Sequence, residues 1–206
     1  LDILCDKYGS DKGFLDLKKR KLFMNRNPHN YTNVYHSLLN HCKDDIKLIL
    51  ECGIGTNNPN IKSSMGIDYK PGASLFMWKD YFKNADIFGC DIDENILFNH
   101  EDRIKTFYVD QLSSHTIKKM WSDINRKDFD LIIDDGLHSF NAAKFFFDNS
   151  FQYLKSGGLY IIEDIGLNYM NLLLDYLQDY KVEVIRLSSN RVKTLADNNM
   201  MIIRKN

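Results

Sequence analysis

The sequence predicts an α/β fold: a seven-stranded, mainly parallel sheet with the last strand antiparallel, helices on both faces and a short N-terminal cap. Three observations predict it. From residue 46 onward, short apolar runs alternate with longer stretches of helical periodicity, which is typical of right-handed β-α-β units. Gly53 and Gly55 follow the first apolar run, and acidic residues end several of the others. Glycines at a strand end that faces a ligand edge make the expected fold Rossmann-like.

The apolar runs and the stretches between them define the individual elements. The expected strands are residues 46–51, 87–91, 104–109, 129–134, 159–163, 182–187 and 200–203. The expected helices are residues 30–41, 74–84, 115–125, 142–154 and 169–180. The connection 188–199 is too polar for a helix, so we expect a hairpin there, which makes the last strand antiparallel.

Two parts of the chain depart from the alternation. Residues 1–42 are mixed and charged, and we expect them to form an N-terminal cap segment packed on a core made by residues 43–206. The polar stretch between Gly55 and Ser74 is long for a connection inside a domain. It is either a lid over a ligand or a tolerated surface insertion.

Composition limits the classes of partner. The chain has 206 residues and a net charge of −1, with 18–21 as its one basic cluster, so we expect no nucleic-acid partner. No apolar run reaches the length of a membrane span, and no signal peptide is evident. The four cysteines lack metal-ligand spacing, and two of them end strand-like runs. These two, Cys52 and Cys90, are expected to be buried thiols and not disulfide partners, which argues for a cytoplasmic protein.

The ends of the first three strands carry groups suited to a nucleoside. Gly53 and Gly55 would let the backbone approach a ligand closely, although the third glycine of a dinucleotide motif is missing. Asp91 ends the second strand, where an acid can accept hydrogen bonds from both ribose hydroxyls. Asp110 and Gln111 follow the third strand and could hold a purine edge. Each acid alone could instead be a helix N-cap.

The fourth and fifth strands both end in pairs of acids. Asp134 and Asp135 precede His138, and Glu163 and Asp164 end the next run. Carboxylates gathered at one edge repel each other unless a cation lies among them, and hard oxygen ligands favour Mg²⁺. His138 would then be a general base. The alternative is that Asp134 caps a helix, His138 lies on the surface and the second pair forms a turn.

These motifs resemble a known class of enzyme. The segment 51–55, Asp91 and Gly157-Gly158 look like class I S-adenosylmethionine-dependent methyltransferases. With the segments 7–13, 72–79, 134–138 and 162–165, the chain resembles the metal-dependent macrolide-sugar O-methyltransferases of the mycinamicin and macrocin type over nearly its whole length. Leu137 departs from the serine usual in that family, and the loop after Gly55 has no clear counterpart.

The resemblance implies a role for each motif. The metal ligands would be Asp135, Glu163 and Asp164, with His138 as the base and Asp135 as the second catalytic residue. Residues 43–206 would form the S-adenosylmethionine-binding domain. The cofactor contacts would fall on the residues of the first four strand ends and of the helix after the long loop, namely Glu51, Gly53, Gly55, Ser74, Leu75, Asp91, Ile92, Asp110, Gln111 and Asp134.

The function that the resemblance implies is an S-adenosylmethionine-dependent, Mg²⁺-assisted O-methyltransferase. Its acceptor would be a hydroxyl of a sugar or a similar small polar molecule, in surface-polysaccharide or natural-product biosynthesis, and the enzyme could be a homo-oligomer. Alternatives are a phosphoryl or other oxygen acceptor, an NAD(P)-dependent oxidoreductase and a non-catalytic binding module. The missing third glycine argues against the oxidoreductase, and the combined acids and histidine argue against the binding module.

Overall fold

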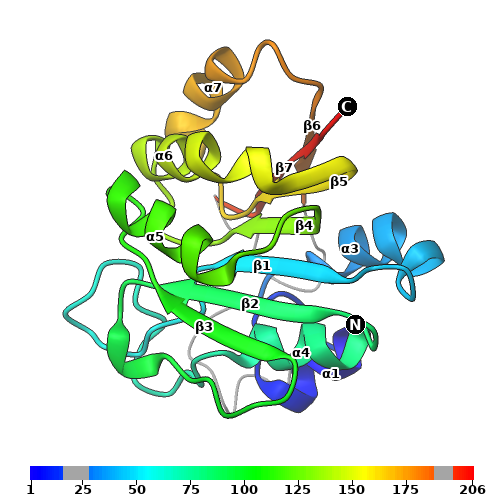
Figure 1. The fold of residues 1–206 in the computed structure, drawn as a ribbon, viewed down its shortest axis with the longest axis vertical. Coiled ribbons are helices and arrows are strands. Elements are labelled where there is room, and N and C mark those ends of the chain that lie inside the picture. The colour runs from blue at the N-terminus through cyan, green and yellow to red at the C-terminus, as the bar shows by residue number, and fades with distance from the viewer. Residues whose placement is uncertain (16–27, 188–196) are drawn as a thin grey trace.

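The structure, a computed structural model, describes residues 1–15, 28–187 and 197–206. Seven strands form one sheet in the order β3-β2-β1-β4-β5-β7-β6 (Figure 1). All neighbouring strands are parallel except that β7 runs antiparallel to both β5 and β6. The strands are β1 (Leu48–Cys52), β2 (Asp86–Asp91), β3 (Ile104–Tyr108), β4 (Phe129–Asp134), β5 (Leu154–Ile162), β6 (Val182–Arg186) and β7 (Asn199–Arg204). The predicted fold class is confirmed.

Helices cover both faces of the sheet (Figure 1). One face packs against α5 (Ser114–Ile124), α6 (Phe140–Ser150) and α7 (Leu167–Tyr176). The other packs against α1 (Asp2–Tyr8), α3 (Thr32–Leu39) and α4 (Ala73–Tyr81). Short 3-10 turns η1 (Asn40–Cys42), η2 (Glu94–Ile96) and η3 (Phe151–Tyr153) complete the described elements. Every residue of β1 is buried, as expected for a strand covered on both faces.

The structure differs from the predicted elements at several boundaries, including these three places. Residues 2–8 form α1, although their mixed composition gives a poor helical pattern. β5 starts at Leu154 rather than at residue 159, with a shift of register between Phe129 and Leu131 of β4 and their partners. The α6 helix ends at Ser150 and continues as η3. The basic cluster 18–21 and most of the expected hairpin connection lie outside the described residues.

The cap shares one hydrophobic core with the sheet. Tyr31, Val34 and Leu39 pack in the same buried cluster as Ile49 of β1 and Trp78 of α4. The boundary at residue 42 therefore stays a prediction, because apolar contacts cross it. Among the described residues, no helix is both long and apolar enough to cross a membrane.

One acid at the opposite edge of the sheet, Asp130, has a structural role. The buried Asp130, near the start of β4, accepts hydrogen bonds from the backbone N–H groups of Lys47 (2.7 Å) and Leu48 (2.9 Å). It also forms an ion pair with Lys155. These contacts join three chain segments at the amino ends of the strands, so this acid is structural. The ligand edge lies at the carboxyl ends of β1, β2, β3, β4 and β5.

Candidate active site

The register of the sheet brings the acids at the strand ends together. Cys52 of β1 lies opposite Asp134 of β4, and Asp134 lies opposite Ile162 of β5. Backbone hydrogen bonds continue this alignment beyond the strands, from Asp135 N–H to the Cys52 carbonyl and from Glu163 N–H to the Asp134 carbonyl, both 2.9 Å. We refer to four side chains that meet here as the carboxylate cluster: Glu51, Asp135, Glu163 and Asp164.

A lysine from the cap lies at the centre of this cluster. Lys12 is only 2% exposed, and its Nζ lies 2.9 Å from Glu51 Oε1 and 2.6 Å from Asp135 Oδ2. The same ammonium forms an ion pair with Glu163 Oε2. Burial lowers the pKa of Lys12, but the charges of the three acids outweigh burial and raise it well above its usual value. The cluster therefore contains one permanent positive charge.

Burial has the opposite effect on the acids. It raises the pKa of Glu51 and raises that of Glu163 well above its usual range, while the charge of Lys12 lowers both. These shifts are the expected result of placing like charges in a low-dielectric site. A further positive charge near the cluster would stabilise the ionised carboxylates.

Two tyrosines of the cap support the second acid pair. Tyr31 donates a hydrogen bond to Asp164 Oδ1 and Tyr35 donates one to Glu163 Oε1, both 2.5 Å. Burial and neighbouring carboxylates raise the pKa of each phenol well above its usual value, so both stay donors. Because both tyrosines are almost fully buried, they hold the acids and do not line an open pocket.

One side of the cluster has the ligand pattern of a cation site. One ligand atom each from Asp135, His138 and Asp164 lies within 4.8 Å of the others, and among the described residues this is the group that fits a metal ion. His138 Nε2 lies 3.8 Å from Asp164 Oδ2. Both His138 (φ 52°) and Asp164 (φ 51°) adopt left-handed backbone conformations. Such strain in non-glycine residues concentrates at functional sites.

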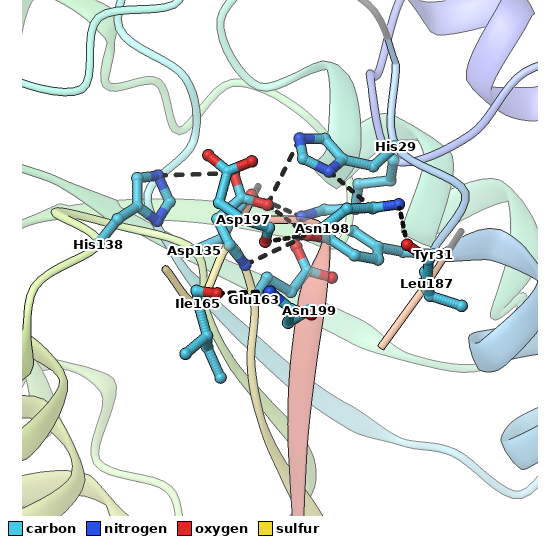
Figure 2. Close-up of polar contacts among 12 residues, drawn as sticks. His29, Tyr31, Asp135, His138, Glu163, Ile165, Leu187, Asp197, Asn198 and Asn199 are labelled. Carbon is cyan, nitrogen blue, oxygen red and sulfur yellow. Dashed lines mark hydrogen bonds and ion pairs between the residues drawn. The ribbon is translucent and has the colours of Figure 1, made fainter. Parts of the chain in front are cut away.

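A second histidine contacts Asp164 from the cap. His29 Nε2 lies 3.4 Å from Asp164 Oδ1, and its Nδ1 lies 3.0 Å from Asn198 Oδ1 (Figure 2). Figure 2 shows His29 and His138 on opposite sides of the acids. Asn198 also donates to Asn30 and to the Leu187 carbonyl. The cap and the approach to β7 thus meet over the second acid pair.

A cavity of about 420 Å³ opens beside the cluster. Gly53 and Gly55 form part of its wall, and both have positive φ angles, 84° and 83°. A Cβ on Gly53 would lie 2.0 Å from the Asp135 carbonyl oxygen, and one on Gly55 would lie 2.2 Å from the Tyr69 ring. Glycine is therefore required at both positions by conformation and by space.

The long connection after Gly55 is folded over the cavity. Thr56 Oγ1 donates to Asp93 (2.5 Å), and the Met65 N–H donates to the Thr56 carbonyl (2.8 Å). Residues of this connection line the cavity, namely Asn60, Ile61, Lys62, Ser63, Met65 and Tyr69. It forms a wall of the cavity, and its motion as a lid stays a prediction.

Three of the predicted cofactor residues line the cavity from β2 and β3. Asp91 accepts hydrogen bonds from the N–H groups of Ile54 (2.9 Å) and Asp93 (3.0 Å). Burial raises its pKa, and these backbone donors lower it. Ile92 is 46% exposed at the cavity, and Asp110 accepts from the Leu112 N–H. An acid and an exposed apolar side chain therefore lie together at the end of β2.

Gln111 lines the cavity, but the structure gives its amide another use. Its Nε2 donates to Asp134 Oδ1 (2.6 Å), and its Oε1 accepts from the Leu137 N–H (2.7 Å). The side chain thus fixes the turn between Asp134 and His138 from the segment after β3, which is separated from β4 in the sheet by β2 and β1. The other Asp134 oxygen, Oδ2, is buried without a hydrogen-bond partner among the described residues. Burial raises the pKa of Asp134 to about 6.

The remaining predicted cofactor residues lie at different depths. Ser74 lines the cavity, and burial raises the pKa of Glu51 while the Ser74 side chain lowers it. Glu51 is fully buried and also accepts from Trp78 Nε1 (3.0 Å). Leu75 is fully buried in the core below the cavity, beside Gly89. Glu51 and Leu75 therefore support the cavity from beneath and do not form its wall.

Sequence reasoning assigned no role to two residues of the site, Lys12 and His29. Lys12 belongs to the segment 7–13 that carries part of the family resemblance, which is the signal that could have found it. His29 follows a stretch without periodicity. A lysine that belongs to no strand end gives no indication that it will be buried among acids.

Comparisons with known proteins identify relatives of this chain. No family model matches the chain. The L-olivosyl-oleandolide 3-O-methyltransferase of Streptomyces antibioticus is 33% identical over 147 residues, covering 68% of this chain and 34% of the relative. The mycinamicin VI 2''-O-methyltransferase of Micromonospora griseorubida is 35% identical over 100 residues, covering 48% of this chain and 24% of the relative. The chain is a homologue of the macrolide-sugar O-methyltransferases.

Solved structures give the fold. MycE, a methyltransferase of the mycinamycin pathway in complex with Mg and SAH, matches with a TM-score of 0.67 at 23% identity. The match covers 99% of this chain and 54% of that one. The chain therefore has the class I methyltransferase fold, and it spans about a third of the length of the oleandolide relative.

The contact between Gly53 and the Asp135 backbone can be tested by substitution. We expect Gly53→Ala to destabilise the protein by about 3 kcal/mol or more, because left-handed strain of about 1–2 kcal/mol adds to a steric clash. Gly66→Ala is the matched control, since Gly66 has a similar φ of 89° but nothing within 4 Å of an added Cβ. Urea unfolding of both variants measures the difference. Equal losses would show that the close approach is not rigid.

Proposed function

We propose that the chain is an S-adenosylmethionine-dependent, Mg²⁺-assisted O-methyltransferase that acts on a hydroxyl of a sugar or similar small polar acceptor. One observation carries the proposal: Asp135, His138 and Asp164 converge beside the glycine-walled cavity at the ligand edge of the sheet. The homology to sugar O-methyltransferases supports it. The chain spans about a third of the length of the oleandolide relative, so the homology by itself does not establish the activity.

The donor set fits a hard divalent cation. Asp135 and Asp164 supply carboxylate oxygens. Glu51, Glu163 and Lys12 lie beside them, and the one positive charge of Lys12 does not balance four carboxylates. Asp135, Glu163 and Asp164 would hold the cation, and Glu163 also contacts Lys12 and Tyr35. When bound, Mg²⁺ lowers the pKa of a coordinated hydroxyl and fixes the acceptor oxygens in place.

The cavity fits S-adenosylmethionine. Its sulfonium methyl group is an activated electrophile, so the protein needs only to orient the acceptor and to remove a proton. Asp91 would accept hydrogen bonds from the ribose hydroxyls, and Gly53 and Gly55 would allow close approach of the backbone. Ser74, Ile92 and Asp110 line the same space. Glu51, Leu75, Gln111 and Asp134 would position these walls, and the unpartnered Oδ2 of Asp134 would accept a hydrogen bond from the bound cofactor.

His138 is placed to act as the general base. It lines the cavity, and 28% of its side chain is exposed, so an acceptor hydroxyl can reach it. Asp164 lies 3.8 Å from its Nε2 and would stabilise the imidazolium that forms when the hydroxyl proton is taken up. Asp135 would act beside it as the second catalytic residue. Gln111 fixes the turn that carries both residues.

The partner and the cellular location follow as part of the same proposal. A net charge of −1 supports a small-molecule acceptor and not a nucleic acid. The four cysteines form no disulfide, which supports a reducing cytoplasm. We also propose that residues 43–206 bind the cofactor and that residues 1–42 complete the site through Lys12 and the cap tyrosines. A homo-oligomer is compatible with this arrangement.

The general base can be tested by removing the imidazole. We expect His138→Ala to lower turnover by about 10²–10⁴-fold, because proton removal is then left to water. Radiolabelled methyl transfer to a panel of glycosides and nucleotide sugars measures turnover, and calorimetry with S-adenosylhomocysteine should show unchanged binding. His115→Ala, an exposed histidine on α5, is the control and should keep full turnover. Unchanged turnover in His138→Ala would refute the base.

The cation can be tested by chelation. We expect turnover to disappear after exhaustive EDTA treatment and to return on addition of Mg²⁺, because hydroxyl activation depends on it. The measurement is the same methyl-transfer assay before and after dialysis, with Ca²⁺ as a comparison ion. Full turnover in chelated protein would contradict a role for the metal while leaving the methyltransferase assignment open.

A further inference from the structure

Asp164 is held in an unusual conformation by groups from distant parts of the chain. Its φ of 51° lies in the left-handed region, which is strained for a residue other than glycine. Its backbone N–H donates to the Tyr31 hydroxyl of the cap at 3.3 Å, and its carbonyl accepts from the Tyr169 hydroxyl of α7 at 3.0 Å. The backbone of this acid is therefore fixed by the protein itself.

The two side-chain oxygens of Asp164 have different surroundings. Oδ1 accepts the hydrogen bond from Tyr31 at 2.5 Å and lies 3.4 Å from His29 Nε2. Oδ2 lies 3.8 Å from His138 Nε2. The wall of the cavity includes Asp164 and His138 but neither His29 nor Tyr31. Oδ1 is thus contacted by the cap, and Oδ2 is the oxygen left for the cavity.

The orientation of the His29 ring is set by Asn198, on the approach to β7 (Figure 2). Asn198 Nδ2 donates to Asn30 Oδ1 (2.8 Å) and to the Leu187 carbonyl (3.2 Å), so Asn198 Oδ1 is the atom that faces His29 Nδ1 at 3.0 Å. An amide oxygen only accepts hydrogen bonds, so Nδ1 of His29 is a donor. Nε2 is then the nitrogen that is left for Asp164.

The contact between His29 and Asp164 is supported by charge and by stacking. Attraction to a carboxylate oxygen requires a hydrogen on Nε2 as well as on Nδ1. Burial lowers the pKa of His29, but the charges of Asp164 and Asp11 outweigh burial and raise it. The His29 ring also stacks on Tyr31, with the ring centroids 4.7 Å apart. The two groups that reach Asp164 Oδ1 therefore support each other, and Asn198 lies behind them.

We propose that His29 is a positioning residue that, with Asn198 behind it, holds Asp164 Oδ1 and so presents Oδ2 alone to the divalent cation. This inference rests on the proposed function, in which Asp135, Glu163 and Asp164 hold that cation. It gives a role to two buried residues outside the cavity wall and makes Asp164 a ligand through one oxygen. Partners that hold a metal ligand from behind typically change metal affinity about 10–100-fold when they are removed.

Two substitutions of His29 separate its two contacts. Asparagine keeps an amide donor near the position of Nδ1, towards Asn198, and glutamine keeps one near the position of Nε2, towards Asp164. We expect Mn²⁺ binding, followed by electron paramagnetic resonance, to weaken about 10–100-fold in His29→Asn and to stay close to the wild-type value in His29→Gln. His41→Ala, an exposed cap histidine in η1, is the control and should bind Mn²⁺ as the wild type does. An equal loss in the two His29 variants, or none in His29→Asn, would overturn the inference and leave the proposed function standing.

The link through Asn198 can be tested by a double-mutant cycle on the same Mn²⁺ affinity. Asn198→Ala should weaken binding by itself but add little to His29→Ala, because both substitutions act on Asp164 through one ring. Fully additive losses would overturn the link. A lower melting temperature with unchanged Mn²⁺ binding would show a purely structural role and overturn the inference as well. If the wild-type protein binds no Mn²⁺, the inference fails together with the metal of the proposed function, and the methyl-transfer assay still decides the reaction.

Discussion

The gathering of four carboxylates at one edge of the sheet, two of them fully buried, is the constraint on which the rest of this site depends. A parallel sheet with this register places Glu51, Asp135, Glu163 and Asp164 side by side whether or not their charges are balanced. Water cannot screen the two buried glutamates, so the protein must supply positive charge and hydrogen-bond donors from elsewhere. Lys12 and the phenols of the cap are that supply. The cap therefore supplies the charge and the hydrogen-bond donors that these carboxylates need.

Much of this arrangement could be predicted from the sequence. Apolar runs that end in acids locate the strands and their ligand edge. A strand covered by helices on both faces is apolar along its length, and a charged side chain is least costly at its end, where it can reach solvent or a ligand. Asp91, Asp135 and His138 accordingly lie where the predicted topology puts them, around one cavity. The glycine after the first strand, Gly53, could also be predicted to approach a ligand. The structure gives the reason for glycine there: a positive φ and the close Asp135 backbone leave no room for a side chain.

Other features depend on contacts between residues far apart in the chain. Gln111 was expected to face a ligand, but its amide is occupied by Asp134 and by the backbone at Leu137. Glu163 contacts Lys12, which lies 151 residues earlier in the chain. An acid in a strand does not reveal which edge it serves, as the structural role of Asp130 shows. Local pattern determines the strand ends, whereas side-chain partners are set by packing.

The central claim is that one cation of the site is built into the chain and a second is bound beside it. A crystal structure of the protein with S-adenosylhomocysteine and Mn²⁺, with anomalous scattering used to locate the metal, tests this most directly. The account predicts an anomalous peak in contact with Asp135, Glu163 and Asp164, at the edge of the cavity that His138 lines. The absence of an anomalous peak at these carboxylates, in crystals grown with Mn²⁺, would contradict it.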